Sequence, residues 1–196
     1  MKKYILILIL SLISCTNETK VHQKIIVIQP LGDFNIEQAK NVLNKIQTIN
    51  PNVVLRKNIP FPKNSYYELR NRYRADTIIK TIKNNIGKDS VIVGLSNKDI
   101  SVTKGKIEDW GVMGLGYHPG KACVVSDFRM SIQNKNEQFY KVVLHELGHT
   151  EGLAHCPVKT CLMRDAEGKN HLNEEKDFCI KCKTYLIEKG WNLKNP

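Results

Sequence analysis

Three histidines and one glutamate near residue 150 constrain this chain more than any other feature. His145 and His149 are four residues apart, a spacing that places both imidazoles on one face of a helix, where they can reach a single metal ion. Glu146 points about 100° away around the same helix. It would therefore lie beside the metal without binding it, where a base acting on water belongs. The sequence predicts a helix over 137–150 that ends in a metal site.

Gly152 and His155 extend this motif to H-E-x-x-H-x-x-G-x-x-H. Glycine adopts a positive φ without steric cost, so Gly152 can end the helix and return His155 to the metal as a third ligand. Three neutral imidazoles leave a fourth tetrahedral position for water, whose pKa a zinc ion lowers to about 7. The extended pattern is typical of metzincin peptidases.

Four cysteines and one methionine follow, and from His155 they form the pattern H-C-x4-C-x-M-x15-C-x-x-C. Over residues 145–182 the chain closely resembles the archaemetzincin family of zinc metallopeptidases. The resemblance implies two zinc ions, one catalytic and one structural. It implies these roles: catalytic zinc ligands His145, His149 and His155; general base Glu146; Met-turn residue Met163; structural zinc ligands Cys156, Cys161, Cys179 and Cys182.

Disulfides are the alternative for the four clustered cysteines, because thiols outside the cytoplasm can oxidise. Cys156 could pair with Cys161, or Cys179 with Cys182. Zinc is the favoured interpretation, since four thiolates match a closed tetrahedral site. Cys123 lies in an apolar strand, and we expect it to be a buried free thiol.

The N-terminal sequence resembles a bacterial lipoprotein signal. Lys2 and Lys3 precede an apolar run that is too short to span a bilayer and closes on Leu-Ile-Ser-Cys. We expect cleavage of residues 1–14, lipidation of Cys15 and a polar tether over 15–23, which would export the protein to the cell envelope and anchor it to a bacterial membrane. A plain secretory signal and an uncleaved anchor are the alternatives.

Residues 24–196 are expected to form one domain. Strand-like runs at 24–29, 53–55, 90–95 and 122–126 alternate with helical patterns at 36–49 and 75–86, which indicates an α/β layer. The resemblance implies a metzincin-like α/β (α+β) fold, with a mixed twisted sheet, an active-site helix and a small C-terminal lobe that contains the Met-turn. Residues 111–117 form either a loop or an irregular edge strand, and His118 is either a cleft residue or an ordinary loop histidine.

The chain is basic, with a formal net charge of +11. Without residues 1–14 it would carry 28 bases and 19 acids, a net charge near +9. The lysines are scattered along the whole chain, whereas a nucleic-acid site concentrates them in a patch. We therefore expect no nucleic-acid partner. We also expect a monomer that binds peptide or protein substrates.

These observations predict a zinc-dependent peptidase that hydrolyses peptide bonds with zinc-activated water and Glu146 as general base. One alternative is a catalytically silent zinc-binding envelope protein that binds peptides without turnover, although such a protein has no use for Glu146. The other is a nucleic-acid-binding zinc protein. Export and the open three-histidine site argue against it.

Overall fold

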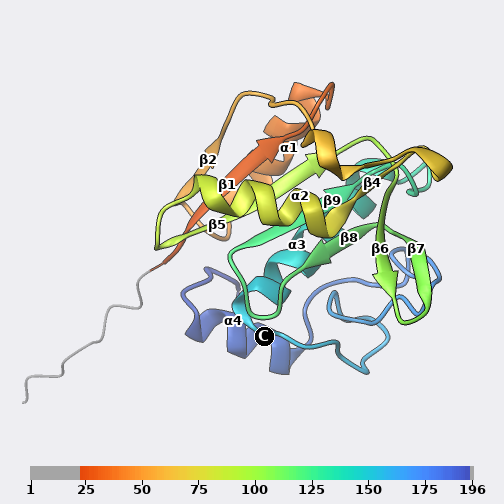
Figure 1. Ribbon diagram of the computed structural model, residues 1–196. Coiled ribbons are helices and arrows are strands. Elements are labelled where there is room, and N and C mark those ends of the chain that lie inside the picture. The colour runs from red at the N-terminus through yellow and green to blue at the C-terminus, as the bar shows by residue number, and fades with distance from the viewer. Residues whose placement is uncertain (1–22, 195–196) are drawn as a thin grey trace, which may run out of the picture.

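A computed structural model describes residues 23–194 (Figure 1). The predicted lipoprotein signal, Cys15 and residues 15–22 of the predicted tether lie outside the described residues. Within 23–194, no helix is long and apolar enough to cross a membrane. The predicted fold class is confirmed: the chain is a mixed α/β structure with helices on both faces of its main sheet.

The main sheet has five strands in the order β2-β1-β5-β9-β8. Its first four strands are parallel, and β8 pairs antiparallel with β9 at the outer edge. The elements that build and cover it are β1 (Ile25–Pro30), α1 (Ile36–Gln47), β2 (Val53–Leu55), α2 (Ala75–Ile82), β5 (Ser90–Ser96), β8 (Gly114–Gly116), β9 (Ala122–Ser126) and α3 (Lys135–Glu151).

Alternation along β1 explains why helices cover both faces. Ile26 and Ile28 are buried in the core that contains the apolar residues of α1 and α3. Val27, between them, is buried on the opposite face among the isoleucines of α2. Successive side chains of a strand point to opposite faces, so a continuous apolar strand needs a helix layer on each side. The sheet is therefore enclosed between α2 and the pair α1 and α3.

A second sheet of four strands was not predicted. Its order is β3-β4-β6-β7, formed by β3 (Tyr66–Tyr67), β4 (Arg72–Arg74), β6 (Ile100–Lys104) and β7 (Ile107–Val112). Strands β6 and β7 form an antiparallel hairpin with Gly105, at φ +59°, in its turn. The hairpin runs directly into edge strand β8, so residues 111–117 include an edge strand, as one of the two interpretations expected.

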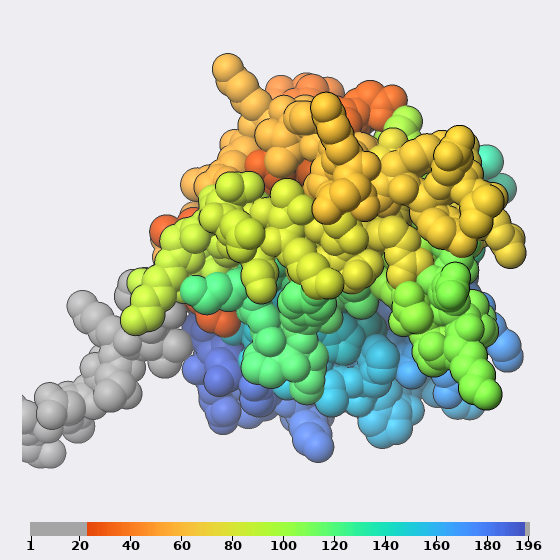
Figure 2. Space-filling view, in the orientation of Figure 1, coloured from red at the N-terminus to blue at the C-terminus, as the bar shows by residue number. Residues whose placement is uncertain are grey.

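Beyond α3 the chain is mostly irregular. Residues 153–179 are all described and contain no helix or strand, and α4 (Ile180–Glu188) follows them. In Figures 1 and 2 this C-terminal part, drawn in blue, lies along the lower side of the molecule, opposite α1 and α2. The predicted C-terminal lobe corresponds to this segment.

Candidate metal centres and cleft

Helix α3 carries the first two histidines at its C-terminal end. The helix ends at Gly152, whose φ of +106° is left-handed. The backbone N–H groups of Gly152 and Leu153 bond carbonyls of the last turn, which is the usual way a glycine closes a helix. The chain then reverses and returns His155 to the other two rings, as the spacing predicted.

The three imidazoles meet with their ring centroids 4.6 to 5.4 Å apart. Nδ1 of His145 donates to the carbonyl of Leu162 at 2.6 Å, and Nδ1 of His149 donates to that of Leu153 at 2.7 Å. A carbonyl can only accept, so Nε2 of each ring is the unprotonated nitrogen. These two lone-pair nitrogens face each other at 3.0 Å, an arrangement that a cation between them would stabilise.

The protonation of these rings also suits a metal. Burial lowers the pKa of His145 to about 3. Burial likewise lowers the pKa of His149, and the nearby His155 lowers it further. Both rings are therefore neutral at neutral pH, which is the form of histidine that binds metal. The donor set fits zinc, since one nitrogen from each of the three rings lies within 4.8 Å of the others.

Glu146 is 6% exposed, and its carboxylate lies against the glycines of β8. A Cβ on Gly114 would come within 2.4 Å of Oε1 of Glu146, and one on Gly116 would come within 2.8 Å of the Glu146 carbonyl oxygen. Burial raises the pKa of Glu146 to about 8, although a backbone hydrogen bond from Gly116 opposes that shift. The missing side chains of β8 thus make the space that this carboxylate occupies.

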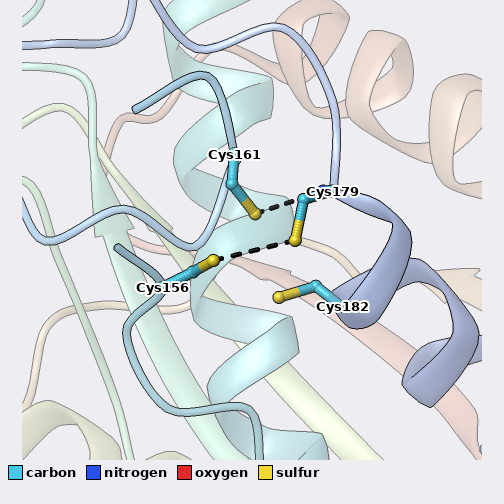
Figure 3. Close-up of side chains that lie close together, drawn as sticks. All are labelled: Cys156, Cys161, Cys179 and Cys182. Atoms are coloured by element: carbon cyan, nitrogen blue, oxygen red, sulfur yellow. Dashed lines mark hydrogen bonds between the residues drawn. The ribbon is translucent and has the colours of Figure 1, made fainter. Parts of the chain in front are cut away.

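The four C-terminal cysteines form a second cluster (Figure 3). All are free thiols, and their Sγ atoms lie within 4.8 Å of one another. Sγ of Cys156 is 3.7 Å from Sγ of Cys179, far beyond a disulfide bond of about 2.05 Å but close to the edge of about 3.8 Å of a tetrahedron with Zn–S bonds of about 2.3 Å. The cluster fits a closed zinc site, and neither disulfide alternative is formed in the structure.

Met163 joins the two centres. It is fully buried, and a Cβ on Gly148 would lie 2.6 Å from its Sδ, so the methionine packs against α3 at Gly148, between His145 and His149. The carbonyl of Met163 accepts from the N–H of Cys156 at 2.7 Å. The turn around Met163 is thereby tied to the residue that follows His155.

A cleft of about 870 Å³ opens over the histidine cluster. One wall is the edge formed by β7 and β8, and the other is the loop over 164–172. His118 lines the cleft: its Nε2 is 2.9 Å from the Gly152 carbonyl, and its ring centroid is 5.9 Å from that of His149. Cys123 lies under the site as a buried free thiol, as predicted, and burial together with the nearby Glu146 raises its pKa.

Two features of the site were missed by the sequence reasoning. The first is the contact of Gly114 and Gly116 with Glu146, which depends on how β8 docks on α3. The second is Asp165, whose Oδ2 lies 3.3 Å from Nδ1 of His155. The only signal for Asp165 was its position two residues after Met163. A hydrogen bond from the Glu167 backbone N–H holds the pKa of Asp165 below its usual range, against the opposing effect of burial.

Comparison with known proteins identifies relatives of this chain. The sequence profile of peptidase family M54 matches residues 20–188. The archaemetzincin of Methanopyrus kandleri is 30% identical over 145 residues, covering 72% of this chain and 79% of the relative. The archaemetzincin of Halobacterium salinarum strain R1 is 27% identical over 169 residues, covering 79% of this chain and 95% of the relative.

A solved structure of similar fold agrees with these relatives. The crystal structure of archaemetzincin from Archaeoglobus fulgidus, complexed with malonate, superposes with a TM-score of 0.70 at 26% identity, covering 82% of this chain and 98% of that one. The histidine cluster, the cysteine cluster and these matches agree with the resemblance seen over residues 145–182. This chain belongs to the archaemetzincins, the zinc metallopeptidases of family M54.

Proposed function

We propose that this metallopeptidase hydrolyses peptide bonds at the three-histidine centre, with Glu146 as the general base. The observation that carries the proposal is the convergence of three imidazoles beside the buried side chain of Glu146 in one cleft. His145, His149 and His155 would hold the zinc ion. When bound there, zinc supplies Lewis-acid chemistry, polarising a carbonyl and acidifying water.

In this proposal Glu146 moves the proton. Its carboxylate takes a proton from the attacking water and delivers it to the leaving amine. The hydrogen bond from Gly116 and the close contact with Gly114 hold the carboxylate in one place. A fixed base needs no reorientation at the moment of reaction, which is how positioning lowers a barrier.

We propose that β8 receives the substrate. It is one of the two edge strands of the main sheet and pairs only with β9 among the described strands. It also lines the cleft with the three histidines. An extended peptide can add to such an edge through backbone hydrogen bonds. The proposed substrate is therefore an extended peptide or an exposed protein segment.

Metal removal tests the proposal. The two proposed zinc sites differ, because a site with an open position exchanges its metal more readily than a closed four-thiolate site. We expect cleavage of a fluorogenic peptide library to stop when a mild chelator removes about one zinc per chain, and to return when zinc is restored. The cysteine thiols should stay protected from a thiol reagent throughout. Cleavage that survives complete loss of the first zinc would contradict the proposal.

The silent zinc-binding alternative gives a different result in the same assay: library peptides bind without being cleaved.

For location, we propose that the protein is exported and lipid-anchored through Cys15. This rests on the N-terminal sequence, with its two lysines, apolar run and Leu-Ile-Ser-Cys ending. The full chain should partition into detergent, and Cys15→Ser should abolish that partitioning.

A further inference from the structure

Two of the three ligand histidines are held differently from the third. His145 and His149 sit on α3, and each ring is fixed by a hydrogen bond from Nδ1 to a backbone carbonyl. His155 lies beyond the end of the helix, and 46% of its side chain is exposed. It has no comparable backbone acceptor among its described contacts. A ligand on an irregular segment needs another partner to fix its ring.

Asp165 occupies the place of that partner. Its Oδ2 lies 3.3 Å from Nδ1 of His155, and its Oδ1 accepts from the Glu167 backbone N–H at 2.9 Å. One carboxylate oxygen is thus tied to the loop while the other faces the imidazole. The Nδ1 side of His155 faces this carboxylate, which leaves Nε2 as the nitrogen available to the metal.

A short backbone bridge lies between these two residues. Cys156 and Arg164 form an isolated parallel bridge, and the N–H of Cys156 donates to the Met163 carbonyl at 2.7 Å. In this parallel register 155 lies opposite 163 and 165 lies opposite 157, so 155 and 165 flank the bridge diagonally. The side chain of Arg164 bonds Glu174 at 2.7 Å and fixes the turn further.

We propose that Asp165 is a positioning residue for the histidine metal site: it orients His155 and increases the affinity of the site for zinc. This inference rests on the proposed zinc site but not on peptide cleavage. Carboxylates and carbonyls that bond the second nitrogen of a ligand histidine fix the ring and increase its basicity, and removing one typically costs about 10- to 100-fold in metal affinity or activity.

Metal competition tests the inference without an activity assay. Full-length parent, Asp165→Asn and Asp165→Ala would be titrated with a chromophoric zinc chelator while a thiol reagent reports on the cysteine cluster. Zinc affinity at the histidine site should fall about 10-fold or more in both variants. The cysteine thiols should remain protected, and in cobalt-loaded protein the visible d–d bands of the histidine site should change.

Glu167→Gln is the matched control. It removes the same unit of charge from the same loop and the same cleft, and its backbone N–H, which holds Asp165, remains. We expect it to keep the parent's zinc affinity and cobalt spectrum. The inference is overturned if both Asp165 variants bind zinc as tightly as the parent, or if Glu167→Gln weakens binding equally, because the effect would then come from cleft charge and not from orientation. If the Asp165 variants bind zinc as tightly as the parent while the parent cleaves peptides, this inference fails and the proposed function stands.

Discussion

At the scale of single residues, Glu175 is a carboxyl buried in the wall of the cleft, with only 4% of its surface exposed. Burial raises its pKa from 4.5 to about 7, although Lys141 and Arg164 oppose the shift. A carboxyl with a raised pKa holds its proton longer in the folded chain than in the unfolded one. Its contribution to stability therefore falls as pH rises from about 4.5 to about 7, and then levels off.

Glu175→Gln should remove the loss of stability that the buried Glu175 carboxyl causes above its pKa. We expect the free energy of unfolding of the variant to exceed that of the parent by about 3 kcal/mol at pH 8, with little difference at pH 4.5, as measured by urea denaturation. Glu174→Gln is the control, because bonds from Arg164 and His171 lower the pKa of that exposed carboxyl, so its loss should give no gain at pH 8. The same difference for Glu175→Gln at both pH values would show that burial does not perturb this group.

At the scale of elements, the packing of β8 against α3 positions the proposed base. Gly114→Ala would place a Cβ 2.4 Å from Oε1 and 2.7 Å from Cγ of Glu146, so the carboxylate must move. A displacement near 1 Å can cost about 100-fold in rate. We expect a large loss of kcat in steady-state assays, with the zinc content unchanged.

Gly87→Ala serves as the control for that variant, since its Cβ would meet only Ser90 Oγ at an ordinary 3.6 Å. It should keep the parent's kcat. Unchanged kcat in Gly114→Ala would mean that the contact between β8 and Glu146 has no part in catalysis.

The same contact shows where sequence reasoning stops. The three histidines are neighbours on one helix and one turn, so local spacing was enough to predict their convergence. The strands β1, β5 and β9 are continuous apolar runs rich in β-branched residues, and that composition was enough to predict them. Strands β6 and β7 and the contact of Gly114 with Glu146 depend on pairing between distant segments, which neither spacing nor composition reveals. Asp165 and His155 flank the bridge between 156 and 164, a pairing that the sequence does not reveal either.

At the scale of the whole molecule, the cleft lies between a sheet-based layer and a C-terminal segment with little regular structure. Residues 153–179 contain no helix or strand, yet they supply His155, Met163, Asp165 and three of the four clustered cysteines. Two contacts outside the cysteine cluster also hold the C-terminal part in place. Trp191 packs edge-on against Phe178, and the N–H of Asn192 donates to the Ile49 carbonyl at 2.7 Å. A zinc ion at the cysteines would contribute directly to the folding of this segment.

The role of Glu146 as general base is tested by comparing the hydrolysis rate and the metal content of Glu146→Gln with those of the parent. The substitution preserves the shape of the side chain and leaves the three imidazoles and four thiols in place. We expect two zinc ions per chain in both proteins and a hydrolysis rate lower by about 10² to 10⁴ in the variant, the contribution of a positioned base. Parental hydrolysis by a zinc-loaded Glu146→Gln would contradict this role of Glu146.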